Sequence, residues 1–498
     1  MLEFTKSLPT FLSSPELLLM TALGTALGIT VGAMPGLTGA MLIALSLPLT
    51  FSMSGDSAMV LLVSMYVGSV SGGLITATLL KIPGTPASMM TTLDGYPMAQ
   101  SGQAKRALGL GILASLVGGL IGWAFLALVS APLATLSLKL GPFEYFSLVL
   151  VALVLISSVS GKSLTKGIFA GSLGLLLAMP GIDPATGQPR MTFGIGELED
   201  GLKLLPVLIG LFAITQILQS AGSKSPPQKA AEIASGSWIR IRDLLGHGIN
   251  LLRSSVLGTL VGILPGVGAN IGSVIAYTTA KNISKSPEEF GQGSEEGIVA
   301  SEAANNASVG GALIPLFAMG IPGSVIDAIL LGALTIHGLQ PGPMLIEQNP
   351  TLFQTLLAAV LLSNLLMFGM MAVSARYLSR LAEIPQYLLV PTVLTLCVLG
   401  SYALANRMFD VWVMLGMGAL GLVMSRFKLP LAPFVIGFVL APIAETHLAE
   451  GLMQSGGSWI PLVARPISLL LLAVAAAVFI YGVRQHQKPA TPASSTGS

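Results

Sequence analysis

The sequence predicts an all-α polytopic membrane protein of two pseudo-repeated halves in inverted orientation, with broken helices or re-entrant hairpins. Three observations support this fold class. Only 9% of the 498 residues are charged and 53% are hydrophobic, whereas soluble domains carry about 25% charged residues. Apolar runs long enough to span a bilayer follow one another along the chain, and a Gly/Pro motif occurs in each half. We therefore expect lipid to be the solvent over most of the surface.

The membrane segments are predicted from the apolar runs, because a spanning helix needs about 20 apolar residues. The candidate segments lie near residues 16–34, 37–53, 57–80, 107–137, 143–160, 164–180, 203–221, 251–280, 298–320, 325–345, 351–375, 385–404, 408–425, 429–444 and 460–483. Several are short or interrupted by Pro and Gly. We expect about 10 to 14 membrane segments, some of them re-entrant.

Composition divides the chain into four parts. Residues 1–221 are predicted to form the first membrane repeat and residues 251–484 the second. Residues 222–250 between them are polar and rich in basic side chains. Basic loops stay on the cytoplasmic side, which predicts a cytoplasmic linker here. Residues 485–498 are rich in Pro, Ala, Ser and Thr, which predicts a disordered tail.

The repeat is seen in three motifs that recur in the same order. The first is Gly28-x-x-x-Gly32-x-x-Pro35-Gly36, which recurs 230 residues later as Gly258-x-x-x-Gly262-x-x-Pro265-Gly266. The other two recur 239 residues later: Ser69-Val70-Ser71-Gly72 as Ser308-Val309-Gly310-Gly311, and Ile82-Pro83-Gly84-Thr85 as Ile321-Pro322-Gly323-Ser324. The nine extra residues fit an insertion in the polar stretch around 287–297, where loops tolerate added length.

The distribution of basic residues favours inversion of the second half. Lys105 and Arg106 precede the span that begins near Ala107. In the second half, Arg376 and Arg380 instead follow the corresponding span. The basic end of the span has changed sides, as expected for an inverted repeat.

The Pro-Gly pairs interrupt apolar runs, because proline removes a backbone donor and glycine releases the chain from helical geometry. Breaks at corresponding positions of two halves are typical of a transport site. The residues after each break can begin a half-helix whose free N–H groups face an anion such as a carboxylate. The candidate substrate-binding residues are Pro35, Gly36, Thr38, Pro83, Gly84, Thr85, Pro265, Gly266, Asn270, Pro322, Gly323 and Ser324. The alternative is that the breaks are hinges or close-packing points between helices.

Polar residues inside the apolar segments are candidates for cation coupling. Glu302, Asn305 and Asn306 share one helical face, and Asp327 follows the fourth break. Oxygen-rich clusters beside an unwound backbone suit a sodium ion or a proton relay. Alternatively, Glu302 caps a helix at the interface and Asp327 caps the half-helix. We expect Asp94 to be solvated in a loop or at a helix end, and His337 to be a packed or hydrogen-bonded interface residue.

Enzyme signatures are missing from the sequence, which has no His cluster, nucleophile elbow or nucleotide-binding loop. We therefore predict that the chain is not an enzyme and needs no cofactor or metal, apart from Na+ or H+ as a coupling ion. The alternatives are a membrane-embedded enzyme and a passive scaffold or channel subunit. The net charge of +2 gives no reason to expect nucleic-acid binding.

Several long motifs resemble the large membrane subunit of tripartite tricarboxylate transporters, the TctA family, over residues from about 15 to 480. They are Val31-Gly32-Ala33-Met34-Pro35-Gly36-Leu37-Thr38-Gly39, Lys81-Ile82-Pro83-Gly84-Thr85-Pro86, Asp94-Gly95-Tyr96-Pro97, Gly262-Ile263-Leu264-Pro265-Gly266-Val267-Gly268-Ala269, and the stretch from Glu295 through Pro322-Gly323-Ser324 to Pro341-Gly342-Pro343. The resemblance implies a multi-pass permease of the bacterial inner membrane with two partners. One is a small membrane subunit of about four spans, and the other is a periplasmic solute-binding protein.

The same resemblance implies carboxylate substrates, with citrate as the name-giving case, and cation-coupled uptake. Selectivity in this family can reside largely in the binding protein, so the resemblance does not identify the carboxylate. An alternative is a stand-alone carboxylate symporter that needs no binding protein.

Overall fold

The computed structural model describes residues 2–34, 37–83, 85–159, 163–183, 186–221, 246–265, 268–381, 386–403 and 405–487. Helices dominate these ranges, as the sequence predicts. Most of the predicted linker, residues 222–245, and residues 488–498 of the predicted tail lie outside the described residues.

The first half contains helices separated by short turns. They are α1 (Leu2–Leu12), α2 (Pro15–Gly32), α3 (Gly39–Thr50), α4 (Gly55–Leu80), η1 (Pro86–Ser88), α5 (Met89–Met98), η2 (Ala99–Gln103), α6 (Ala104–Ser137), α7 (Pro142–Val159), α8 (Leu164–Leu177), η3 (Gly196–Leu198), α9 (Leu204–Ile209), η4 (Gly210–Ile214) and α10 (Thr215–Ala221). Between α8 and η3, the strands β1 (Gly181–Ile182) and β2 (Pro189–Arg190) form an antiparallel hairpin in which Gly181 is opposite Arg190.

The second half continues the helical pattern. Its helices are α12 (Gly248–Ile263), α13 (Gly268–Ile283), η5 (Pro287–Glu289), α14 (Glu295–Met319), α15 (Val325–Ile336), α16 (Pro343–Gln348), α17 (Pro350–Leu381), α18 (Gln386–Ala403), α19 (Met408–Arg426), α20 (Leu431–Gln454), α21 (Ile460–Ala464) and α22 (Pro466–Gln487). The last helix therefore includes the first three residues of the stretch predicted to be a tail.

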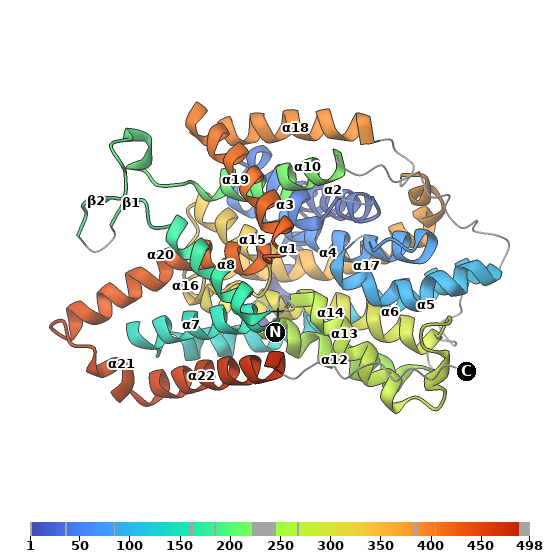
Figure 1. Cartoon of the computed structure of the whole chain (residues 1–498). Helices are drawn as coiled ribbons and strands as arrows, with labels where there is room; N and C mark the ends of the chain where they lie inside the picture. The colour runs from blue at the N-terminus through green and yellow to red at the C-terminus, as the bar shows by residue number, and fades with distance from the viewer. Residues whose placement is uncertain are drawn as a thin grey trace, which may run out of the picture.

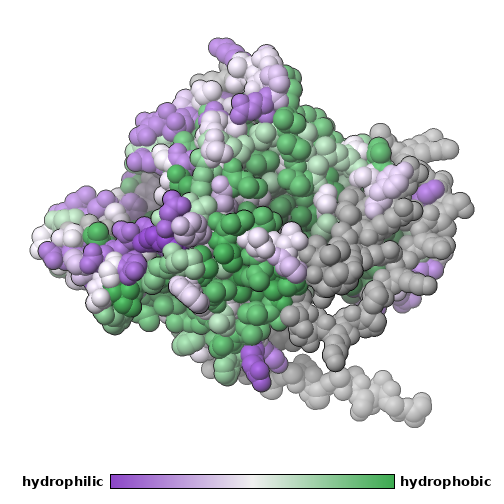
Figure 2. Space-filling view, turned by 90° about the horizontal axis from the view of Figure 1, so that it is seen from above, coloured by the Kyte–Doolittle hydropathy of each residue, from purple (hydrophilic) through white to green (hydrophobic). Residues whose placement is uncertain are grey.

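Within the described residues, seven helical stretches are long and apolar enough to cross a membrane by length and composition. They are α2, α4, Met89–Ser137, Pro350–Ala375, α19, α20 and Pro466–Arg484. Shorter apolar helices, such as α3, α12 and α15, accompany them. The long helices run side by side (Figure 1), and a broad apolar surface covers the middle of the molecule (Figure 2). The chain is thus a multi-pass, all-α membrane protein.

The molecule has two polar ends. The linker end, where α6, α12 and α14 begin, lies on the right of Figure 1, and there Glu295 pairs with Arg106 and His247. The hairpin end carries the β1–β2 hairpin on the left of Figure 1, where Arg190 pairs with Glu445 of α20. Hydrogen bonding to Glu445 raises the pKa of Arg190. Hydrophilic side chains gather on the left in Figure 2 as well.

Two helix pairs, α2 with α4 and α12 with α14, pack closely at the centre because glycines of one helix lie against backbone carbonyl groups of the other. An added Cβ at these glycines would collide with a carbonyl oxygen. The glycine–carbonyl pairs are Gly28–Met65, Gly32–Ser69, Gly258–Ala304 and Gly262–Ser308. The two helix pairs therefore make equivalent contacts. The glycines of α12 lie 230 residues after those of α2, and the carbonyl groups of α14 lie 239 residues after those of α4, which are the offsets of the repeated motifs.

The long central helices α4 and α14 also end alike. Each ends with a residue of left-handed conformation, Lys81 with φ 58° and Gly320 with φ 70°. The next N–H group turns back to a carbonyl of its own helix, from Ile82 to Thr76 at 3.4 Å and from Ile321 to Pro315 at 3.2 Å. This C-terminal turn satisfies helix carbonyls and reverses the chain direction before the Pro-Gly sequence.

Candidate functional site

The described parts of the four breaks lie close together. A Cβ on Gly39, at the start of α3, would collide with the Ser69 side chain of α4 and would lie 3.3 Å from Ile326 Cδ1 of α15. A Cβ on Gly323 would lie 3.0 Å from the carbonyl oxygen of Gly262, which precedes the third break. The Ser273 hydroxyl of α13 donates to the Ala87 carbonyl of η1 at 2.7 Å. The breaks of one half are therefore packed against those of the other.

The structure places the candidate substrate-binding residues unevenly. Four of them lie outside the described residues: Pro35, Gly36, Gly84 and Gly266. Asn270 belongs to α13, but its side chain is not among the described parts of the chain. Pro83, Thr85, Pro265, Thr38 and Ser324 are half-buried, and Pro322 and Gly323 are buried. Their role in substrate binding stays a prediction.

The hydroxyl groups after the breaks accept hydrogen bonds from backbone N–H groups at the starts of the helices that follow. Thr38 caps α3 by accepting the Met41 N–H at 3.2 Å, and Ser324 caps α15 by accepting the Asp327 N–H at 3.3 Å. In the first half, the Thr85 N–H donates to the Ser88 hydroxyl at 3.1 Å. Such caps begin a helix immediately after the break. The N-terminal ends of α3 and α15 consequently face the region where the breaks meet.

Glu302 lies at the centre of a buried polar cluster that joins four helices, α4, α5, α6 and α14. Its carboxylate accepts hydrogen bonds from Thr91 of α5 at 2.5 Å and from Ser115 of α6 at 3.2 Å. Asn306 donates to the Glu302 carbonyl at 3.1 Å and accepts from Ser71 of α4 at 2.5 Å. We call these residues, with Ser301, the Glu302 cluster. They make a continuous set of oxygen atoms inside an apolar core.

The alternative in which Glu302 caps its helix at the interface is wrong. Ser294 caps α14, and Glu302 is fully buried two turns further along. Asn305 is also fully buried. Its amide lies beside the Glu302 carboxyl, but neither its nitrogen nor its oxygen makes a hydrogen bond of normal geometry to a described residue. A buried amide without partners is costly, so this position is suited to a ligand or water.

A second buried carboxylate belongs to Asp327 in the first turn of α15. It is fully buried, and both of its oxygens lack a hydrogen bond of normal geometry to any described residue. The Ser324 hydroxyl and the N–H groups of Ser324 and Asp327 lie beside it, and the Tyr66 hydroxyl of α4 lies 3.4 Å from the Ser324 hydroxyl. We call these three residues the Asp327 cluster. Asp327 does not pair with a basic residue in any ion pair of the described chain.

The solvated position expected for Asp94 is wrong. Asp94 is fully buried in α5, where one carboxylate oxygen accepts the N–H groups of Gly291, Gly293 and Ser294 at 2.7, 3.0 and 2.9 Å. Its other oxygen accepts the Tyr277 hydroxyl at 2.8 Å. Four donors replace the water that a carboxylate would otherwise need. Asp94 thus ties α5 to the loop that leads into α14.

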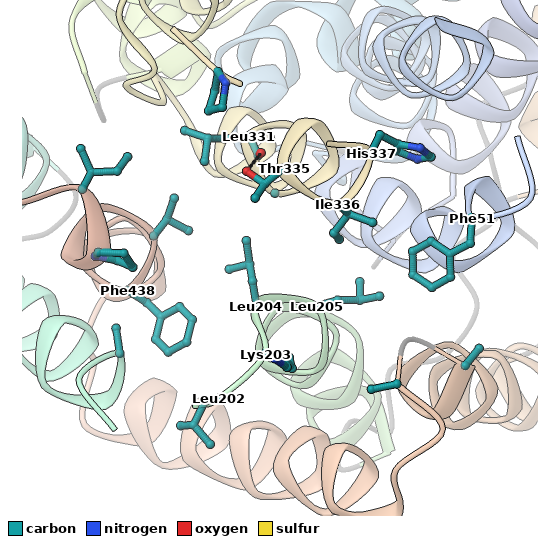
Figure 3. A pocket seen from close by; sticks show the side chains of 18 residues that line it. Phe51, Leu202, Lys203, Leu204, Leu205, Leu331, Thr335, Ile336, His337 and Phe438 are labelled. Atoms are coloured by element: carbon teal, nitrogen blue, oxygen red, sulfur yellow. Dashed lines mark hydrogen bonds between the residues drawn. The ribbon is translucent and has the colours of Figure 1, made fainter. Parts of the chain in front are cut away.

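A cavity of about 960 Å³ lies on the hairpin side of the breaks. Figure 3 shows it between the outer turns of α15, the start of α9, Phe51 and Phe438 of α20. Its lining is mainly apolar, with Lys203, Thr335 and His337 as polar members. His337 is held by Thr50, whose Oγ1 lies 3.0 Å from His337 Nε2, which agrees with the hydrogen-bonded interface position expected for it.

Known proteins with similar sequences identify the family of the chain. The model described as "Tripartite tricarboxylate transporter TctA family" matches residues 18–436. An Agrobacterium vitis protein described as "Uncharacterized 52.8 kDa protein in TAR-I ttuC' 3'region" is 34% identical over 457 residues, 92% of this chain and 91% of that protein. A second protein of that organism, "Uncharacterized protein in TAR-II ttuC' 3'region", is 36% identical over 217 residues, 44% of this chain and 90% of that protein. No solved structure matches significantly.

The family match covers most of the chain and includes all four Pro-Gly breaks. It agrees with the multi-pass helical fold. The resemblance inferred from the sequence motifs is therefore confirmed. This chain belongs to the tripartite tricarboxylate transporter TctA family, a family of membrane transporters.

Proposed function

We propose that this chain is the large permease subunit of a binding-protein-dependent secondary transporter. It imports carboxylates of the tricarboxylate type, such as citrate, across the bacterial inner membrane with cation coupling. The observation that carries the proposal is the packing of breaks from both halves beside two buried carboxylates, Glu302 and Asp327, in a chain of the TctA family. The chain has no catalytic role in this proposal.

The substrate carboxylates are bound where the N-terminal ends of α3 and α15 meet. Unpaired N–H groups at a helix start attract an anion, and the helix dipole adds to the attraction. The Thr38, Thr85 and Ser324 hydroxyls can donate further hydrogen bonds. The loops of the two halves contribute equivalent groups, which suits a substrate with carboxylates at both ends.

The two halves are related by inversion in this proposal, and three contacts of α4 and α5 with the second half support it. Tyr66 of α4 contacts Ser324, which follows α14, and Ser71 contacts Asn306 within α14. Further along the first half, Thr91 contacts Glu302, nearer the start of α14. The contacts advance along one half as they go back along the other, so α4 and α14 run in opposite directions. Inverted halves allow alternating access around a fixed central site.

The linker end is cytoplasmic in this proposal. The positive-inside rule assigns the end richer in Lys and Arg to the cytoplasm. The described basic residues at the linker end include Lys105 and Arg106 at the start of α6, Lys281 in the last turn of α13 and Lys285 just after it. The hairpin end then faces the periplasm, where a solute-binding protein delivers the substrate. A small membrane subunit of about four spans completes the assembly.

Uptake of labelled citrate, succinate and tartrate into cells tests the proposal. The chain is expressed alone or with its small membrane subunit and binding protein, in sodium medium or in medium with sodium replaced by choline. We expect uptake only with both partners, and faster uptake with sodium. Uptake by the chain alone would identify a stand-alone symporter and contradict the dependence on a binding protein.

A further inference from the structure

The Glu302 cluster and the Asp327 cluster are built alike. Each joins the long central helix of one half to the segment after the break of the other half. In the first, Ser301 and Glu302 of α14 meet Thr91 of α5. In the second, Tyr66 of α4 meets Ser324 at the start of α15. Tyr66 and Asn305 are themselves equivalent at the 239-residue offset of the repeat.

The two carboxylates nevertheless differ in how they are satisfied. Both Glu302 oxygens accept hydrogen bonds from hydroxyl groups. Both Asp327 oxygens are buried without a hydrogen bond of normal geometry to any described residue. An ionised carboxylate away from water is very unfavourable unless it is paired or coordinates a cation. Asp327 is thus the less well satisfied of the two carboxylates, with only the Ser324 hydroxyl and the N–H groups of Ser324 and Asp327 beside it.

The surroundings of Asp327 are suited to a small cation. The carboxylate and the hydroxyls of Ser324 and Tyr66 are hard oxygen ligands, which alkali and alkaline-earth cations prefer over nitrogen or sulfur. The described ion pairs bring no basic side chain to Asp327, so a cation would not compete with a protein charge. The half-buried Ser324 shows that the cluster is near, but not sealed inside, the packed core.

The cavity on the hairpin side and Asp327 lie along the same helix, α15. The cavity of about 960 Å³ is lined by Leu331 and Thr335 of α15. Residues four apart lie on one helical face, so Asp327, Leu331 and Thr335 form one line along α15. Asp327 is therefore one turn beyond the cavity lining. Figure 3 shows Leu331 and Thr335 at the cavity.

We propose that the Asp327 carboxylate, with the Ser324 and Tyr66 hydroxyls, binds the coupling sodium ion, and that Glu302 holds α14, α5 and α6 together without binding it. This inference rests on the proposed transport function and assigns its coupling site. Sodium binding at the start of α15 neutralises the carboxylate beside the break. The occupied site can then hold the Ser324 end of the break in place while an anionic substrate binds nearby.

The test measures sodium binding directly, independently of substrate uptake. The purified full-length chain in detergent is melted in sodium chloride and in choline chloride of equal ionic strength. A ligand that binds the folded state raises the melting temperature in a concentration-dependent way. We expect sodium to stabilise the wild-type chain and the Glu302→Gln variant, and to have no effect on Asp327→Asn. The control is Asp56→Asn, which makes the same change at an exposed aspartate in the first turn of α4 and should respond like the wild type.

Two further variants keep the test decisive if Asp327→Asn fails to fold. Ser324→Ala and Tyr66→Phe each remove one hydroxyl ligand and retain the carboxylate, so the half-saturating sodium concentration should rise by about tenfold. A wild-type sodium response in Asp327→Asn, or in both hydroxyl variants, would overturn the assignment. The assignment would also be overturned if sodium did not raise the melting temperature of the wild-type chain, or if only a change of pH raised it. Partner-dependent carboxylate uptake in that case would leave the proposed function standing.

Discussion

The hydrogen bonds of Asp94 allow a prediction of local stability. Replacing Asp94 with alanine removes the acceptor of the Gly291, Gly293 and Ser294 N–H groups and of the Tyr277 hydroxyl. A buried donor without a partner costs about 1–3 kcal/mol. If each of the three N–H groups costs about 1 kcal/mol, the closed form of the loop before α14 is destabilised by about 3 kcal/mol relative to the open form. A free-energy change of that size raises the population of the open loop by about a hundredfold.

Hydrogen–deuterium exchange of a peptide spanning the loop measures this effect. We expect the Gly291, Gly293 and Ser294 amides of Asp94→Ala to exchange about a hundredfold faster than in the wild type. Asp94→Asn keeps one acceptor oxygen, so its exchange should increase much less. Asp200→Ala is the control, because this exposed carboxylate pairs with Arg407 far from the loop. Unchanged exchange in Asp94→Ala, or equal effects of Ala and Asn, would refute the reasoning.

Two further predictions concern the packing of the helices and the anchoring of the hairpin. Gly32→Ala and Gly262→Ala place a methyl group against a backbone carbonyl, and each should lower the free energy of unfolding by about 1–3 kcal/mol. Gly369→Ala is the control and should not lower the melting temperature, because an added Cβ there meets nothing within 4 Å. Equal melting temperatures of all three variants would contradict the close approach of the helices. Arg190→Gln removes the ion pair with Glu445 and should speed proteolytic cleavage of the segment between α8 and α9; an unchanged cleavage rate would show that the pair does not anchor the hairpin.

Local patterns in the sequence were sufficient to predict the membrane class, the helical fold and the position of the breaks. Long apolar runs, and Pro-Gly pairs inside them, have direct local consequences for the backbone. The repeated glycines were visible for the same reason, at Gly32 and Gly262. The residues that these glycines contact could not be predicted, because the contacts are made by backbone carbonyl oxygens, which every residue type carries.

The polar clusters show where sequence reasoning fails. Glu302 was found because a carboxylate inside an apolar segment is unusual, but Thr91 and Ser115 were missed. They lie 211 and 187 residues away from Glu302 in the chain, and threonine and serine are common in membrane helices. Asp94 was misplaced because Asp94-Gly95-Tyr96-Pro97 has the composition of a turn. The donors that allow its burial come from a loop about 200 residues further on, which only the tertiary fold brings near.

The central claim is that the packed breaks of the two halves form the site through which carboxylates pass. Gly323 tests it most directly, since an added Cβ there would lie 3.0 Å from the Gly262 carbonyl oxygen and from Ala312 Cα. Uptake of labelled carboxylate is measured in cells with both partner subunits for Gly323→Ala, Gly323→Trp and, as a matched control, Gly369→Trp. Membrane expression and the melting temperature of each purified variant show that it is folded. We predict reduced uptake for Gly323→Ala, none for Gly323→Trp and normal uptake for Gly369→Trp; normal uptake by a folded Gly323→Trp would contradict the account.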